Sequence, residues 1–223
     1  MNTFLSLIAP ELEKETGTPY SALLEEVWQV YESQMLERFP FIGGDQSSGT
    51  RNLTGAYCYV ALGVVCRGYG MELERWGKLC TISYRRYFEK LPKFVRGLPK
   101  LLLKYPAFAN RMLQKKDRAN AENSAANPGA FETKVQPPTE EYAVIYHTNF
   151  CPLADFARKY GYLEYMPYIC NLDYVTFGLF GIPFYREKTC ADGDGVCDFK
   201  FSRHAPVVPD WPCHAADPND PLK

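Results

Sequence analysis

The spacing of apolar residues changes near residue 130, and this change limits the chain to a fold that combines helices with a sheet. Before that point apolar residues recur at helical spacing, whereas residues 131–135 and 141–148 alternate as strands do. Residues 184–190 and 196–202 alternate again around a turn at 192–195, which predicts a hairpin. The pattern predicts an α+β fold: N-terminal helices packed on a small antiparallel β-sheet with a C-terminal hairpin.

Helical spacing, first-turn prolines and terminal glycines predict the individual helices. We expect them over about residues 18–38, 52–66, 71–90, 151–161 and 168–179. Between the predicted helices and strands, residues 117–128 are rich in Ala, Asn and Ser without a clear period, which favours a linker or loop.

These elements predict a single α+β domain over residues 1–205. Its helical part covers about residues 1–116 and its sheet-containing part about residues 130–203. The proline-rich residues 206–223 are expected to form an extended tail.

Composition excludes several classes of protein. The 223 residues are 46% hydrophobic, and 25 basic residues nearly balance 26 acidic ones, which argues against a disordered, collagen-like or nucleic-acid-binding chain. The uncharged stretch 52–66 is shorter than the roughly 20 residues that a membrane-spanning helix needs. The apolar run at residues 4–9 has no basic residue before it and no cleavage site after it, so we predict no secretory signal and a cytoplasmic protein.

One segment departs from this charge balance. Residues 85–118 hold 11 basic and two acidic residues, and three prolines cut the segment into short pieces with an apolar side. A solvated face would explain the charge; so would a segment that lies on an anionic surface or covers an acidic ligand.

The eight cysteines show no CxxC pair, which argues against a zinc ribbon or a thioredoxin-type redox site. We therefore expect reduced thiols, no metal and no cofactor. Cys58, Cys66 and Cys80 fall on predicted core helices, where small buried residues are typical.

The C-terminal half contains the residues best suited to catalysis. Cys151 opens a predicted helix, where free backbone N–H groups and the helix dipole favour the thiolate and lower the pKa. Cys170 and Asp173 share one helix face, and a carboxylate among apolar residues must be paired or protonated. Strand alternation places Cys197 on the opposite side from Asp198, so we expect Asp198 to pair with a basic group or to accept from backbone donors.

His147 precedes Cys151 closely enough to suggest a Cys–His pair. A metal site made from Cys151, Cys170, Cys197 and His147 has suitable ligand types but no diagnostic spacing, and it stays an alternative.

The order of residues between 151 and 201 resembles one known family. The matching positions are Cys151, Gly161, Glu164, Cys170-Asn171-Leu172-Asp173, Arg186, Thr189, Gly193-Asp194-Gly195-Val196-Cys197-Asp198-Phe199 and Phe201. This pattern is similar to the L-2-amino-thiazoline-4-carboxylic acid hydrolase family. The resemblance implies a hydrolase that opens a cyclic isothiourea and yields N-carbamoyl-cysteine.

Ring opening requires an attacking group, proton transfer and a cation for the substrate carboxylate. We expect Cys151 or Cys170 to attack or to position water, Asp173 to move protons, and Arg186 to hold the carboxylate. Cys197 completes the catalytic candidates, and Thr189 and His147 join Arg186 as substrate-binding candidates.

Two other functions stay open. One is a ring-opening hydrolase, cyclase or isomerase of secondary metabolism that acts on a larger substrate, which the high content of Tyr and Phe favours. The other is a non-enzymatic protein that binds a small molecule or a membrane surface through the basic segment. We expect a small-molecule partner, no nucleic acid and no transmembrane segment, and a homodimer stays open.

Overall fold

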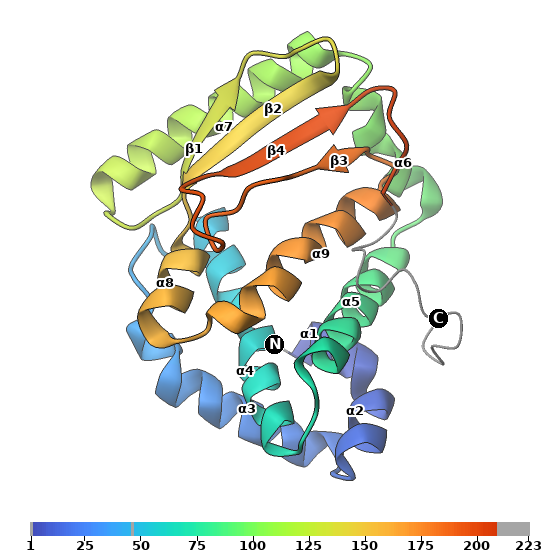
Figure 1. Cartoon of the computed structure of the whole chain (residues 1–223), viewed down its shortest axis with the longest axis vertical. Helices are drawn as coiled ribbons and strands as arrows, with labels where there is room; N and C mark the ends of the chain where they lie inside the picture. The colour runs from blue at the N-terminus through green and yellow to red at the C-terminus, as the bar shows by residue number, and fades with distance from the viewer. Residues whose placement is uncertain (1, 46, 209–223) are drawn as a thin grey trace.

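The computed structural model describes residues 2–45 and 47–208. Figure 1 shows a sheet in its upper part, with helices from the first half of the chain below it. The helix α9 (Met166–Leu179) lies between these two parts, and α7 (Pro106–Ala126) runs along the sheet beside β1.

The sheet has four antiparallel strands in the order β1-β2-β4-β3. They are β1 (Glu132–Gln136), β2 (Tyr142–Phe150), β3 (Phe184–Tyr185) and β4 (Cys197–Ser202). The α+β prediction is therefore confirmed. The rings of Tyr174 and Phe177 on α9 pack against Phe184 of β3, so α9 covers the inner face of the sheet.

The first arm of the C-terminal hairpin is shorter than its alternation predicts. β3 ends at Tyr185, and beyond it the chain bonds mainly to side chains, with a backbone bond from the amide of Asp198 to the carbonyl of Lys188 at 3.3 Å. The amide groups of Glu187 and Lys188 donate to Oδ1 of Asp198 at 3.0 and 2.6 Å, and the amide of Thr189 donates to Asp194 at 2.9 Å.

The N-terminal half is helical, as predicted. Its elements are α1 (Asn2–Leu5), η1 (Ser6–Ile8), α2 (Ala9–Thr16), α3 (Tyr20–Gln34), η2 (Leu36–Arg38), α4 (Ser48–Gly68) and α5 (Leu73–Glu89). The main core forms where α3, α4 and α5 meet α9, around side chains such as Tyr57, Trp76 and Leu79 that are at most 1% exposed.

Helix α4 begins earlier than the sequence pattern predicts. The Ser47 hydroxyl accepts a hydrogen bond from the amide of Gly49 at 3.2 Å, which caps a first turn at residues 48–51. These residues were expected in the preceding loop, and their inclusion in the helix moves Arg51 and Asn52 onto its first turns.

The predicted linker at residues 117–128 is wrong. α6 (Lys93–Leu102) is followed by α7, which continues through these residues to Ala126. Asp117 accepts hydrogen bonds from the amide of Val135 and the hydroxyl of Thr133, and Asn120 also donates to Thr133 at 2.9 Å. Bonds to β1 therefore stabilise a helix that lacks an apolar period of its own.

Two shorter helices precede α9: α8 (Pro152–Tyr160) and η3 (Leu163–Tyr165). α8 ends as predicted at Gly161, whose φ of 82° suits glycine. α9 packs closely on α5, because Gly77 leaves room for the ring of Tyr168.

Within the described ranges, no helix is both long and apolar enough to cross a bilayer. Most of the predicted tail, residues 209–223, lies outside the described residues.

Candidate active site

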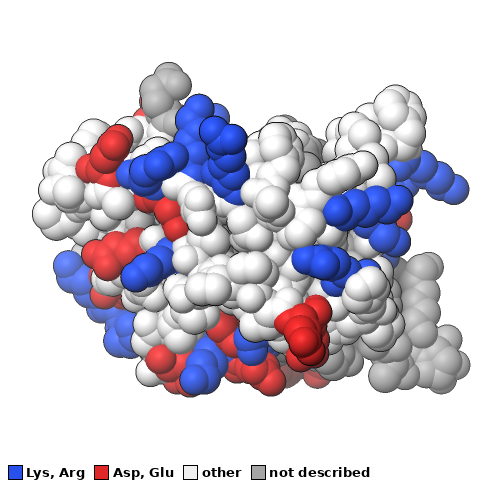
Figure 2. All heavy atoms as spheres, turned by 90° about the horizontal axis from the view of Figure 1, so that it is seen from above, with Lys and Arg blue, Asp and Glu red and all other residues white. Residues whose placement is uncertain are grey.

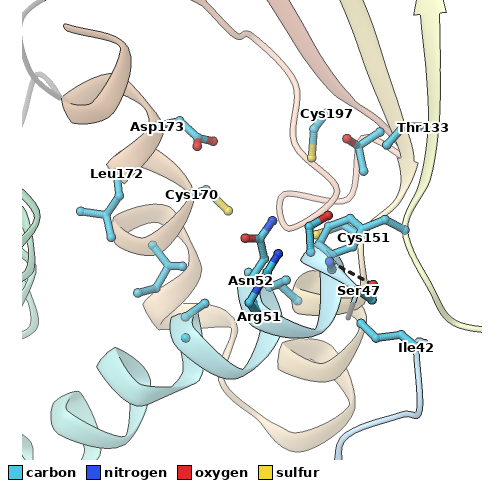
Figure 3. Close-up of a pocket in the computed structure, with 18 of the residues that line it drawn as sticks. Ile42, Ser47, Arg51, Asn52, Thr133, Cys151, Cys170, Leu172, Asp173 and Cys197 are labelled. Carbon is cyan, nitrogen blue, oxygen red and sulfur yellow. Dashed lines mark hydrogen bonds between the residues drawn. The ribbon is translucent and has the colours of Figure 1, made fainter. Parts of the chain in front are cut away.

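A cavity of about 500 Å³ lies between the sheet and the helices α4, α7 and α9. Residues from both halves of the chain line it, and Figure 3 shows Asp173 and Cys170 on one side of the space with Thr133 and Cys151 across from them. All four predicted catalytic residues line the cavity: Cys151, Cys170, Asp173 and Cys197. Arg186 lines it as well.

Arg186 holds the carboxylate of Asp173 in place. Its Nη1 donates to Oδ2 of Asp173 at 2.8 Å, while Nη2 donates to the carbonyl of Cys170 at 2.8 Å and to Oδ1 of Asn171 at 2.9 Å. The guanidinium also packs against the rings of Phe184 and Phe199. Only 3% of the Arg186 side chain is exposed. This cation is therefore engaged by the protein itself.

The Asp173 carboxyl remains accessible from the cavity. Its side chain is 41% exposed, and it lines the cavity although it sits within the protein interior. Desolvation in this enclosed position raises the pKa of Asp173 above its usual range, while the charge of Arg186 and its hydrogen bond oppose the rise. A carboxyl with a raised pKa can both accept and return protons near neutral pH.

The thiols on the cavity wall are poorly ionised. Burial raises the pKa of Cys151 to about 12, and the smaller lowering effect of the Leu153 and Ala154 amides does not offset it. The start of α8 therefore does lower the pKa of Cys151 as expected, but burial outweighs this effect and the net pKa is raised. Burial also raises the pKa of Cys170, and hydrogen bonding to the Cys190 thiol together with burial raises that of Cys197.

Strand alternation separates neighbouring residues of β4 as predicted. Cys197 and Phe199 line the cavity, whereas Asp198 turns away from it. Asp198 pairs with Lys200 at 2.8 Å and accepts from two backbone amides, which confirms its predicted partners.

Two predicted substrate-binding residues lie away from the cavity. Tyr146 and Thr148 line it, so the intervening His147 points to the opposite face of the sheet. The Cys151–His147 pair therefore does not form. The Thr189 hydroxyl donates to Asp192 at 2.7 Å within the exposed β3–β4 turn.

Helices α4 and α7 supply a polar wall that was not predicted. α4 contributes Arg51 and Asn52, and Figure 3 shows Asn52 extending into the space below Cys197. α7 contributes Lys116, Asn120 and Asn123, whose spacing places them on one helix face. A signal for the α4 wall in the sequence is Ser47, which caps the first turn of α4.

The three core-helix cysteines differ in position. Cys66 and Cys80 are fully buried, as predicted, whereas Cys58 is half-buried and reaches the cavity wall.

Over the described ranges, no group of three or more His, Cys, Asp or Glu side chains is arranged to hold a metal ion. The alternative of a metal site at Cys151, Cys170, Cys197 and His147 is therefore not supported by the arrangement of those residues.

The fold and the cavity define an α+β protein with a carboxyl group and several thiols around one enclosed space. Residues 103–201 match the family model of L-2-amino-thiazoline-4-carboxylic acid hydrolase, so this segment of the chain is similar to that family. This match confirms the resemblance drawn from the sequence. No curated protein and no solved structure matches the chain. The matched segment includes α7, the sheet and α9, but not α4.

Proposed function

We propose that this protein is a hydrolase that opens a cyclic amidine or isothiourea ring, such as that of 2-amino-thiazoline-4-carboxylate. The observation that carries the proposal is the Asp173 carboxyl, which Arg186 fixes at 2.8 Å and which remains accessible from the cavity. The family match supports hydrolysis as the reaction class.

In the proposed reaction water adds to the ring carbon that lies between nitrogen and sulfur. The water oxygen bonds to this carbon and one proton goes to the ring nitrogen. The carbon–sulfur bond then breaks, the sulfur takes the second proton, and a urea carbonyl remains. Asp173 is the proposed group that accepts and delivers these protons, because its carboxyl lines the cavity and burial raises its pKa above the usual range.

Water is a better candidate than a thiol for the attacking group. A thiolate is the nucleophilic form of cysteine, and burial raises the pKa of both Cys151 and Cys170. Cys170 shares a helix face with Asp173, three residues away, so we propose that its neutral thiol positions the water or donates a hydrogen bond.

The substrate carboxylate is better matched by Arg51 and Lys116 than by Arg186. Arg186 already bonds to three protein oxygens, whereas Arg51 and Lys116 are exposed side chains on the cavity wall. Asn52 and Asn120 add amide donors on the same two helices. We therefore propose that the anionic end of the substrate faces α4 and α7 and its ring faces α9.

Turnover of 2-amino-thiazoline-4-carboxylate by three variants tests these roles. Asp173→Asn should lower kcat by about 10²-fold to 10⁴-fold, since it removes the proton-transfer group. Cys170→Ser should retain most activity if water attacks. Equal losses in Cys170→Ser and Asp173→Asn would instead favour the thiol as nucleophile, and full activity of Asp173→Asn would refute the proposal.

The volume of the cavity favours a second candidate, a hydrolase, cyclase or isomerase that acts on a larger substrate. A space of about 500 Å³ falls in the range of roughly 300–1,000 Å³ that is typical of pockets for drug-sized ligands. Native mass spectrometry of the purified protein would distinguish the candidates, because a bound molecule larger than the ring acid, displaced only by excess ring acid, would favour this alternative.

The state of the cysteines supports the proposal that the protein works in the reducing cytoplasm. The seven cysteines in the described ranges are all free thiols. A higher specific activity of the protein after export to an oxidising compartment would contradict this location.

A further inference from the structure

The segment from the end of α5 into α7 presents large apolar side chains to solvent. Phe94 is 75% exposed, Tyr105 66%, Phe108 56% and Leu98 54%. Leu91, Leu101 and Met112 are also exposed. Elsewhere in the described ranges exposed large apolar residues are scattered along the chain, whereas here they recur within residues 91–112. We call this set of side chains the α6–α7 apolar surface.

This surface is anchored rather than loosely attached. Leu103 and Ala109 are only 9% and 6% exposed, and both belong to the core cluster beside the sheet. The Asn110 side chain donates a hydrogen bond to the carbonyl of Ala143 at 3.1 Å. Amphipathic helices of globular proteins usually turn their apolar side toward the core. Here Phe94, Leu98 and Leu101 are exposed to solvent, whereas Leu103, which follows them, is buried.

The charge around this surface has one sign. Residues 91–116 contain seven basic side chains and no acidic one. They are Lys93, Arg96, Lys100, Lys104, Arg111, Lys115 and Lys116. On the face seen from above, Figure 2 shows groups of Lys and Arg side chains with uncharged surface between them, and Asp and Glu side chains on the left and lower parts of this face.

We propose that the α6–α7 apolar surface docks on a bilayer of anionic phospholipid, with Phe94, Leu98 and Phe108 entering the headgroup region. Aromatic and leucine side chains bordered by Lys and Arg are the composition of helices that lie in a membrane interface. Each basic side chain near such a surface adds attraction that salt weakens.

A second copy of the chain fits this surface less well. A two-fold symmetric contact sets a patch against itself, so the basic residues would face the same basic residues without an acidic partner in the patch. An anionic lipid surface neutralises them instead. This inference concerns the outer surface, and apart from Lys116, which also lines the cavity, it uses none of the residues proposed to act on the substrate.

Co-sedimentation of the full chain with vesicles tests the docking. Binding should be strong to vesicles of phosphatidylcholine mixed with phosphatidylserine, weak to pure phosphatidylcholine, and lost as sodium chloride is raised. The double variant Phe94→Ser/Leu98→Ser and the variant Lys100→Glu should each reduce the apparent affinity about tenfold or more.

Matched controls distinguish binding through this surface from non-specific adsorption to vesicles. Phe41 is 72% exposed outside the segment, so Phe41→Ser should bind as the wild type does. Lys14→Glu tests an exposed lysine on α2 in the same way. Circular dichroism spectra that match the wild type would show that the variants fold.

Three results would overturn the proposal. One is equal sedimentation with both vesicle types, and another is loss of binding in Phe41→Ser to the same extent as in Phe94→Ser/Leu98→Ser. The third is a wild-type protein that does not bind vesicles and forms a dimer in analytical ultracentrifugation, where Phe94→Ser/Leu98→Ser is monomeric.

Discussion

Nη1 of Arg186 lies 2.8 Å from Oδ2 of Asp173, and the two side chains differ sharply in exposure, 3% against 41%. The arginine is buried against rings and the carbonyl oxygen of Cys170, whereas the carboxyl faces the cavity. This asymmetry makes Arg186 a positioning residue and leaves Asp173 as the group that can meet a ligand.

Removal of this cation should raise the pKa of Asp173 further. Burial already raises it and Arg186 opposes the rise, so Arg186→Met should shift the carboxyl titration further upward. Carboxyl ¹³C NMR of Asp173 measures this without any substrate. Arg186→Lys, which keeps the charge, should shift it less. Arg67→Met removes an exposed ion pair with Glu164 and should leave the titration unchanged.

Asp198 should stabilise the fold at neutral pH. Burial alone would raise its pKa, but hydrogen bonds from Lys200, Lys188 and Glu187 outweigh burial and lower it. A lowered folded-state pKa means that the stabilisation is present above the unfolded pKa and is lost as the pH falls through the folded pKa. Asp198→Asn should therefore cost about 2 kcal/mol at pH 7.

Urea unfolding of wild type and Asp198→Asn from pH 7 down to acid pH provides the measurement. The difference in unfolding free energy should shrink as the pH falls. A difference that stays constant over this range would mean that the charge of Asp198 does not contribute. Asp192→Asn, in the exposed turn, serves as the control.

The polar wall of the cavity should govern the affinity for anionic ligands. Arg51→Ala and Lys116→Ala should each raise KM for an anionic substrate about tenfold and leave kcat nearly unchanged, because they bind the end of the substrate that does not react. Lys115→Ala is a matched control, since Lys115 is the exposed neighbour of Lys116 and does not line the cavity. An equal rise in KM for all three variants would indicate that the basic side chains act only through long-range electrostatic attraction and not by contact with the substrate.

Gly77 should be intolerant of a side chain. A methyl group there would lie 2.0 Å from Cδ1 of Tyr168, so Gly77→Ala should separate α5 from α9 and destabilise the protein by about 1–3 kcal/mol. Gly68 ends α4 with no atom within 4 Å of such a methyl group. Thermal unfolding of Gly77→Ala and Gly68→Ala compares the two, and equal melting temperatures would contradict the close packing.

Local periodicity was sufficient to predict most of the sheet and the inner face of β4, but not the short length of β3 or the outward position of His147. Alternation along 197–201 placed Cys197 and Phe199 opposite Asp198, because side-chain direction in a strand depends only on position. The helix that carries Cys170 and Asp173 was also predictable from the local sequence.

Properties that depend on distant segments were not predictable in this way. Helix α7 is stabilised by bonds from Asp117 and Asn120 to β1, so its own sequence resembled a linker. Arg51 reaches the cavity only after α4 packs beside α9 and α7. The raised pKa of Cys151 likewise results from burial by the whole fold, which the local position at a helix start does not reveal.

Helix α4 forms one wall of the cavity, yet it lies outside the family-matching residues 103–201. The Arg186–Asp173 pair lies inside the matched segment, whereas Arg51 and Asn52 of the polar wall lie outside it. Exchanges in residues 47–58 could retune which molecule is accepted while the Arg186–Asp173 pair stays intact, and such exchanges offer a direct route to engineered selectivity.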